Sequence, residues 1–147
     1  MKWNKNIMMW WCNVNNNIKE KLIDKAKTMR QNAYSPYSKF KVGAAVLTQQ
    51  DNIYGGCNIE NVSFGLTNCA ERTAVFKAVS AGETKIKALA LVGGDTNPVS
   101  PCGACRQVIS EFAVDNKDFL IIMAAASGKI VEYNLDELFP EPFMEEF

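Results

Sequence analysis

Two short apolar runs with a helical segment between them constrain the fold of this 147-residue chain more than any other feature. Residues 88–92 and 119–126 are almost continuously apolar, which is typical of strands covered on both faces. Residues 101–112 between them have the pattern of a helix, with Ser100 expected as N-cap and Pro101 as the first helical residue. A strand, helix, strand succession predicts a parallel crossover.

The remaining segments predict a hairpin and further helices around this unit. Apolar residues at helical spacing indicate a helix over residues 18–33. Residues 40–47 and 53–57 flank a polar turn at 49–52 and predict a β-hairpin. Other expected elements are a helix at 69–79 ending near Gly82, an edge strand at 130–133 and a helical turn at 135–138. Together they predict a mixed sheet with helices on both faces.

Composition and charge narrow the class of protein. Lys plus Arg and Asp plus Glu both number 16, so no long-range attraction to nucleic acid or to an anionic membrane is expected. No apolar run reaches the ~20 residues of a membrane span, and residues 7–11 are too few for a signal-peptide core. We therefore expect a cytoplasmic protein with a single domain at 17–147. Residues 1–16, in which Met8 or Met9 could be the true start, form an extension of unknown role.

The chain contains five Cys and no His, so a zinc site could use only thiolates or carboxylates. Cys102 and Cys105 are three residues apart in a predicted helix and would face the same side of it. Cys69 begins another predicted helix and could supply a third thiolate, which a helix N-terminus stabilises. Three protein ligands would leave a coordination position for water, which is the pattern of a catalytic zinc site.

Glu71 follows Cys69 by two residues and is the best acid/base candidate in a chain without His. Other interpretations of each feature stay open. Cys-x-x-Cys also serves redox sites and structural zinc, and any Cys can be a small buried hydrophobe. Glu71 could belong to a capping box whose N-cap is Asn68. The joint pattern, Cys-x-Glu followed by Pro-Cys-x-x-Cys, favours zinc catalysis.

Three segments closely resemble cytidine deaminase, in its small, homotetrameric, three-cysteine branch: residues 56–61 (GCNIEN), 69–74 (CAERTA) and 100–108 (SPCGACRQV). The resemblance implies a three-layer α/β/α fold with a mixed five-stranded sheet. It implies one Zn²⁺ per chain, held by Cys69, Cys102 and Cys105. In the implied reaction, zinc-bound hydroxide attacks C4 of cytidine or deoxycytidine while Glu71 shuttles protons. The products would be uridine or deoxyuridine and ammonia, a hydrolysis that belongs to pyrimidine salvage.

The same resemblance implies the substrate contacts. Asn58 and Glu60 would bind the ribose hydroxyls, chiefly on the 3′ side, and alternation on an extended segment would point them the same way. Phe40 would pack against the pyrimidine ring. The amide of Ala70 would hold the base carbonyl, and the carbonyl of Ser100 would receive the departing amine. Without the resemblance, Phe40 would be assigned to the core of a strand and the two polar residues to a loop.

Two further residues owe their expected roles to the resemblance. Arg72 would donate hydrogen bonds to the thiolate ligands and offset their excess negative charge, although a surface position is the alternative. Phe143 would reach the base of a neighbouring chain in a homotetramer with shared active sites. Its alternative is a hydrophobic plug on its own domain. Cys57 is expected to be buried and inert, and Cys12 receives no role.

Three other functions remain open. A deaminase of another cytosine nucleoside, such as a blasticidin-type antibiotic, would share the metal motifs, although Asn58, Glu60 and Phe40 favour plain nucleosides. Zero net charge and the Cys-Ala-Glu form disfavour an enzyme that edits nucleic acid. A non-catalytic interaction module with structural zinc would need a fourth protein ligand, and none lies at a suitable spacing.

Overall fold

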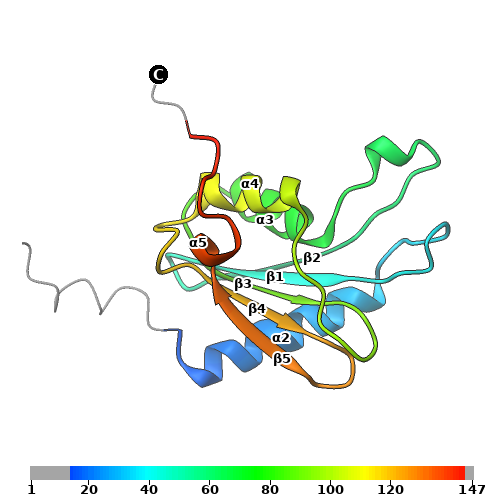
Figure 1. The fold of residues 1–147 in the computed structure, drawn as a ribbon, viewed down its shortest axis with the longest axis horizontal. Helices are drawn as coiled ribbons and strands as arrows, with labels where there is room; N and C mark the ends of the chain where they lie inside the picture. The colour runs from blue at the N-terminus through cyan, green and yellow to red at the C-terminus, as the bar shows by residue number, and fades with distance from the viewer. Residues whose placement is uncertain (1–13, 145–147) are drawn as a thin grey trace, which may run out of the picture.

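A computed structural model describes residues 14–144, which are built around one five-stranded sheet of order β2-β1-β3-β4-β5 (Figure 1). The strands are β1 (Gly43–Thr48), β2 (Ile53–Cys57), β3 (Ile86–Val92), β4 (Leu120–Ala124) and β5 (Ile130–Asn134). Strand β3 is parallel to β4, and every other neighbouring pair is antiparallel. The predicted mixed sheet and its parallel crossover are therefore confirmed.

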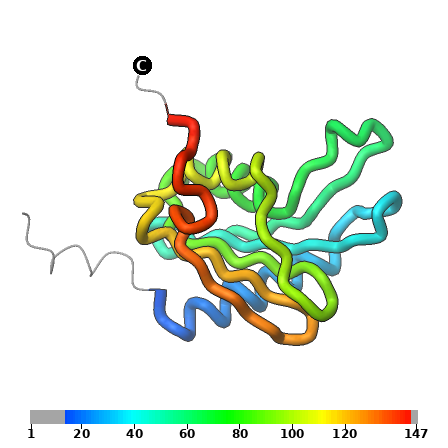
Figure 2. The backbone as a smooth tube through the Cα atoms, in the orientation of Figure 1, coloured from blue at the N-terminus to red at the C-terminus, as the bar shows by residue number. Residues whose placement is uncertain are grey.

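Helices cover both faces of the sheet and complete a three-layer α/β/α arrangement (Figures 1 and 2). Helix α2 (Asn16–Gln31) lies on one face, against β1, β2 and β3. Helices α3 (Ala70–Ser80) and α4 (Gly103–Phe112) lie side by side on the other face. The 3₁₀ turn η1 (Phe64–Leu66) and the short helix α5 (Leu135–Leu138) complete the described elements.

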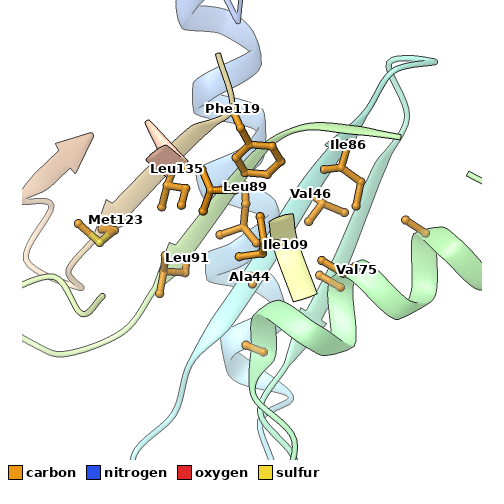
Figure 3. Close-up of a cluster of buried hydrophobic side chains, with 14 residues drawn as sticks. Ala44, Val46, Val75, Ile86, Leu89, Leu91, Ile109, Phe119, Met123 and Leu135 are labelled. Carbon is orange, nitrogen blue, oxygen red and sulfur yellow. The ribbon is translucent and has the colours of Figure 1, made fainter. Parts of the chain in front are cut away.

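Alternation along the strands divides the interior into two hydrophobic clusters. Val46, Leu89 and Met123 point to the α3 and α4 side (Figure 3), whereas their neighbours in the strands point to α2. On the α2 side the strands present small residues, and Gly43 comes so close that an added Cβ would lie 2.0 Å from the carbonyl oxygen of Ala26. The glycine is therefore required for α2 to lie flat on β1.

The helix and strand ends differ from the predicted ends where a side chain fixes them. Helix α2 begins two residues before the predicted start because the Asn15 side chain accepts a hydrogen bond from the Ile18 amide at 3.0 Å. Val14 is buried on the same side of the sheet, so the expected boundary between residues 16 and 17 falls inside the packed fold. Strand β1 begins at Gly43 rather than residue 40, because the Asn58 side chain binds the backbone of the preceding segment.

The end of helix α3 agrees with its prediction. Gly82 has φ +92°, the left-handed conformation that terminates many helices, and its amide donates to the carbonyl of Val79. None of the helices within residues 14–144 is long and apolar enough to cross a membrane. Met8, Met9 and Cys12 lie outside the described residues.

Candidate metal and active site

The N-termini of α3 and α4 bring three thiols together. Cys69 and Cys102 are the N-caps of the two helices, and Cys105 lies in the first turn of α4. Their sulfur atoms all lie within 4.8 Å of one another, and Cys69 Sγ is 3.9 Å from Cys102 Sγ. Tetrahedral zinc with Zn–S bonds of ~2.3 Å separates its sulfur ligands by ~3.8 Å. The donor set therefore fits a zinc ion, and within the described residues this group contains no fourth His, Cys, Asp or Glu.

The start of α4 corrects the sequence prediction. Ser100 is not the N-cap and Pro101 is not the first helical residue. The cap is Cys102, whose sulfur accepts a hydrogen bond from the Cys105 amide at 3.4 Å. Arg106 holds the preceding segment, because it donates to Ser100 Oγ at 2.7 Å and to the Pro101 carbonyl at 2.8 Å. The helix begins two residues later than expected, which places both of its thiols beside Cys69.

The thiols and their neighbours form a strongly interacting charged group. Arg72 Nη2 donates to Cys69 Sγ at 3.4 Å. Contact with the Cys105 thiol and with the Arg72 guanidinium lowers the pKa of Cys69 to about 5, against an opposing effect of burial. The same contact with Cys69, together with burial, raises the pKa of Cys105. Cys69 is therefore the more acidic thiol of this pair.

Glu71 is buried beside this group, with 5% of its surface exposed. Burial raises the pKa of its carboxyl to about 7, and the charge of Cys69 adds to the shift. A carboxyl that titrates near neutrality is suited to both accepting and releasing a proton. The capping box with Asn68 is wrong, because the N-cap of α3 is Cys69 and the Asn68 side-chain Nδ2 donates to Thr73 Oγ1 instead.

Helix α3 reaches this position because β2 allows it to approach closely. A Cβ added to Gly56 would lie 2.4 Å from the Ala74 nitrogen and 2.8 Å from the Ala70 carbonyl oxygen. Only glycine therefore lets the first turn of α3 lie against the strand. The close contact also contributes to the burial of Glu71, which belongs to that turn.

A cavity of about 300 Å³ opens onto the thiols and Glu71. It is lined by five of the other predicted site residues, Phe40, Asn58, Glu60, Ala70 and Ser100, and of the three thiols by Cys69. Cys102 also lines it, whereas Cys105, Arg72 and Phe143 do not. The sequence interpretation missed five lining residues: Ser38, Val42, Thr67, Leu91 and Val99. None of these five residues lies in the three segments that carry the resemblance, so no motif pointed to them.

Two polar side chains at the outer end of the cavity retain hydrogen-bonding capacity. Asn58 Oδ1 accepts from the Val42 amide at 2.9 Å, and its Nδ2 donates to the Phe40 carbonyl at 2.8 Å, which leaves one N–H free. Glu60 accepts from the amides of Tyr37 and Ser38 and from the Ser38 hydroxyl. A carboxylate has about four acceptor positions, so Glu60 keeps one. The hydrogen bond from Ser38 is also the main reason that the pKa of Glu60 is lowered.

Phe143 lies outside the cavity of its own chain. Its side chain is 72% exposed, so its interpretation as a hydrophobic plug on its own domain is wrong. Gln107 of α4 holds its backbone through two hydrogen bonds. Sequence reasoning did not identify Gln107, which reads as an ordinary helical residue. Cys57 is buried as expected, and burial raises the pKa of its thiol.

Comparison with known proteins gives one consistent family. Residues 16–121 match the family described as "Cytidine and deoxycytidylate deaminase zinc-binding region". A cytidine deaminase of Sporosarcina psychrophila is 53% identical over 127 residues, which cover 86% of this chain and 92% of that protein. The crystal structure of cytidine deaminase from Burkholderia pseudomallei superposes with a TM-score of 0.79 at 43% identity, covering 84% of this chain and 98% of that one. A blasticidin-S deaminase of Bacillus cereus is 32% identical over 111 residues, 70% of this chain and 76% of that protein.

Proposed function

The chain belongs to the cytidine and deoxycytidylate deaminase family of zinc-dependent hydrolases, and from this premise we propose that it deaminates cytidine and deoxycytidine. The products are uridine or deoxyuridine and ammonia. The observation that carries the proposal is the arrangement of a three-thiol group and the buried Glu71 at one cavity of about 300 Å³. That volume lies at the small end of the range for small-molecule sites, as a nucleoside requires.

One Zn²⁺ per chain is held by Cys69, Cys102 and Cys105. The bound ion supplies a nucleophilic oxygen at neutral pH, because it acidifies water. Arg72 offsets the charge of three thiolates through its hydrogen bond to Cys69. The absence of a fourth protein ligand among residues 14–144 supports a catalytic site over an interaction module with structural zinc.

Glu71 moves the protons of the reaction. It takes a proton from the attacking water and passes it to N3 of the cytosine ring, and then takes the proton of the new hydroxyl on C4 and passes it to the departing amine. The amide of Ala70 binds the base carbonyl, and the carbonyl of Ser100 receives the amine. Phe40 packs on the ring. All four residues line the same cavity, which supports these roles.

Asn58 and Glu60 bind the ribose, chiefly at its 3′-hydroxyl. A hydroxyl both donates and accepts, and the free N–H of Asn58 beside the free acceptor position of Glu60 matches that pattern. This pairing supports a nucleoside as substrate rather than free cytosine. The lower identity to the blasticidin-S deaminase gives the antibiotic alternative less support than the nucleoside.

The active form is a homotetramer in which neighbouring chains complete each site. Support comes from Phe143, which is held by its backbone while its ring stays exposed. Further support comes from Val62, Phe64 and Leu66, exposed apolar side chains in the loop that follows Glu60. Exposed apolar side chains gathered on one loop are typical of surfaces that another chain covers. The reduced thiol cluster fits a cytoplasmic location.

The direct test incubates the zinc-loaded protein with cytidine and follows ultraviolet absorbance together with ammonia release. We expect uridine from cytidine and deoxyuridine from deoxycytidine, each with one equivalent of ammonia. Free cytosine should be a very poor substrate, because the ribose contacts that position the reacting ring are missing. A protein that contains zinc but releases no ammonia from either nucleoside would overturn the proposal. If a blasticidin-type substrate is turned over faster than cytidine, the antibiotic rather than the plain nucleoside is the substrate.

A further inference from the structure

The loop that carries Phe40 is bound along the segment that carries Asn58 and Glu60. The Tyr34 amide donates to the Asn58 carbonyl at 3.0 Å, and the Glu60 amide donates to the Tyr34 carbonyl at 2.9 Å. Both segments extend beyond the same end of the sheet, on the right in Figure 1. Asn58 Nδ2 also donates to the Phe40 carbonyl, so contacts between the two segments hold the backbone of Phe40.

The backbone just before Phe40 adopts a conformation that needs outside support. Lys39 has φ +60°, in the left-handed region that side chains other than glycine disfavour. The Lys39 amide donates to the Ser35 carbonyl at 3.0 Å. On the other side, the Phe40 amide donates to Ser38 Oγ at 3.0 Å. The Ser38 hydroxyl therefore closes the turn across Lys39.

The same hydroxyl also donates to Glu60 Oε1. A serine hydroxyl has one proton, so giving it to Glu60 leaves only lone pairs for the Phe40 amide. The result is a continuous line of hydrogen bonds from the Phe40 amide to Ser38 and from Ser38 to the Glu60 carboxylate. Hydrogen bonds in such a line polarise and strengthen one another. Ser38, Phe40 and Glu60 all line the active-site cavity.

We propose that Ser38 is a positioning residue that couples recognition of the ribose by Glu60 to placement of Phe40 against the base. The inference rests on the proposed function, in which Glu60 binds the 3′-hydroxyl. A ribose hydroxyl on the last acceptor position of Glu60 fixes the carboxylate, which fixes the Ser38 hydroxyl and thereby the turn at Lys39. The gain in kcat/KM from the 3′-hydroxyl then depends on Ser38, although Ser38 does not take part in the chemistry.

The test compares cytidine with 3′-deoxycytidine in the zinc-loaded wild type and in Ser38→Ala. The wild type should prefer cytidine by about tenfold or more, as expected for a hydrogen bond to a charged group. Ser38→Ala should reduce that preference by about tenfold. Ser38→Thr keeps the hydroxyl and should restore it. Ser80→Ala, on the exposed end of α3, is the matched control and should leave both rates unchanged.

The second half of the coupling is tested by a double-mutant cycle. Each single variant, Ser38→Ala and Phe40→Ala, should lower kcat/KM by some factor. The double variant should lower it by less than the product of those two factors, because both substitutions disturb the same ring. Zinc content and melting temperature establish that each variant is folded. If Ser38→Ala does not fold, Ser38→Cys takes its place, since a thiol is a weaker donor of similar size, and the same loss of preference is expected.

The outcomes separate this inference from the function on which it rests. Equal losses on both substrates in Ser38→Ala, with the cytidine preference intact, would overturn the coupling and leave the ribose contact standing. If the losses in the cycle multiply independently, Ser38 does not act through Phe40 and the coupling is likewise overturned. A wild type without any preference for cytidine over 3′-deoxycytidine would instead refute the assignment of Glu60 to the ribose.

Discussion

Gln107 and Phe143 are joined by a reciprocal pair of hydrogen bonds: Gln107 Nε2 donates to the Phe143 carbonyl at 2.8 Å, and the Phe143 amide donates to Gln107 Oε1 at 3.0 Å. The pair fixes the C-terminal segment on α4 while the Phe143 ring remains exposed. An amide side chain that satisfies both backbone groups of one residue determines where that residue sits. The ring is therefore presented outward in a defined place.

Phe143→Ala should lower kcat/KM for cytidine about tenfold or more, because an aromatic–base stack contributes ~1–3 kcal/mol where alanine substitution has measured it. The sharper measurement mixes two inactive parents, Glu71→Gln and Phe143→Asp, under conditions of subunit exchange. Sites that combine Glu71 from one chain with Phe143 from another should recover activity. A protein that sediments as a monomer, or a mixture that stays inactive, would refute the shared site.

Gln107→Leu should behave like the Phe143 variants, since it removes both hydrogen bonds and keeps the volume of the side chain. We expect partial recovery of activity when it is mixed with Glu71→Gln. Mixing it with Phe143→Asp should recover nothing, because every chain then lacks a correctly placed ring. Recovery in that second mixture would mean that Gln107 acts on something other than Phe143.

Cys102→Ala should abolish zinc binding, because it leaves only two thiolate ligands, Cys69 and Cys105, where zinc sites use three or four protein ligands. Metal analysis of the native protein should give one zinc per chain. Cys57→Ala is the matched control: the residue is a buried thiol outside the group, and its variant should keep the metal. Full zinc content in Cys102→Ala would contradict the ligand assignment.

Glu71→Gln should reduce turnover by ~10²–10⁴-fold or more, the usual effect of removing a positioned acid or base. Zinc should remain, because the carboxylate is not among the metal-binding group. Glu111→Gln, an exposed glutamate on α4, serves as control and should be fully active. Near-normal turnover in Glu71→Gln would remove this residue from the mechanism.

Glu83 should make the unfolding free energy depend on pH in the acidic range. Hydrogen bonds from Thr48, Tyr54 and Asn52 lower the pKa of its carboxyl in the folded chain. A lowered pKa contributes stability above the unfolded pKa of ~4.3, and that contribution is lost as the pH falls through the folded value. The difference in unfolding free energy between the wild type and Glu83→Gln should therefore shrink between neutral pH and pH 3. Denaturant titrations measure it, and a constant difference would refute the assignment.

The fold could be predicted from the sequence because its signals are local. The hairpin strand at Ile53–Cys57, the helix end at Gly82 and the parallel crossover each follow from a short pattern of apolar residues and turn residues. The grouping of the three thiols with Glu71 could likewise be predicted, because each motif lies at the start of a helix and the two helices pack on one face of the sheet.

The remaining features depend on contacts between distant segments. Ser100 followed by Pro101 is a strong sequence signal for a helix start, yet Arg106 binds the hydroxyl and Cys102 takes the cap. The turn at Lys39 is flanked by Ser38, whose hydroxyl donates to Glu60, 22 positions further along the chain. No local pattern contains that information, so the turn before Phe40 could not be predicted.

Helix α4 carries two of the three thiols at its start and, through Gln107, holds the segment that presents the Phe143 ring. If each site needs a metal-loaded chain and an intact neighbour, an ordered first turn of α4 is required twice. If zinc is removed at random from a fraction of the chains, a site then stays active only when both chains that form it have kept their zinc. Residual activity would follow the square of the loaded fraction, so that half-depleted protein would retain about a quarter of its activity.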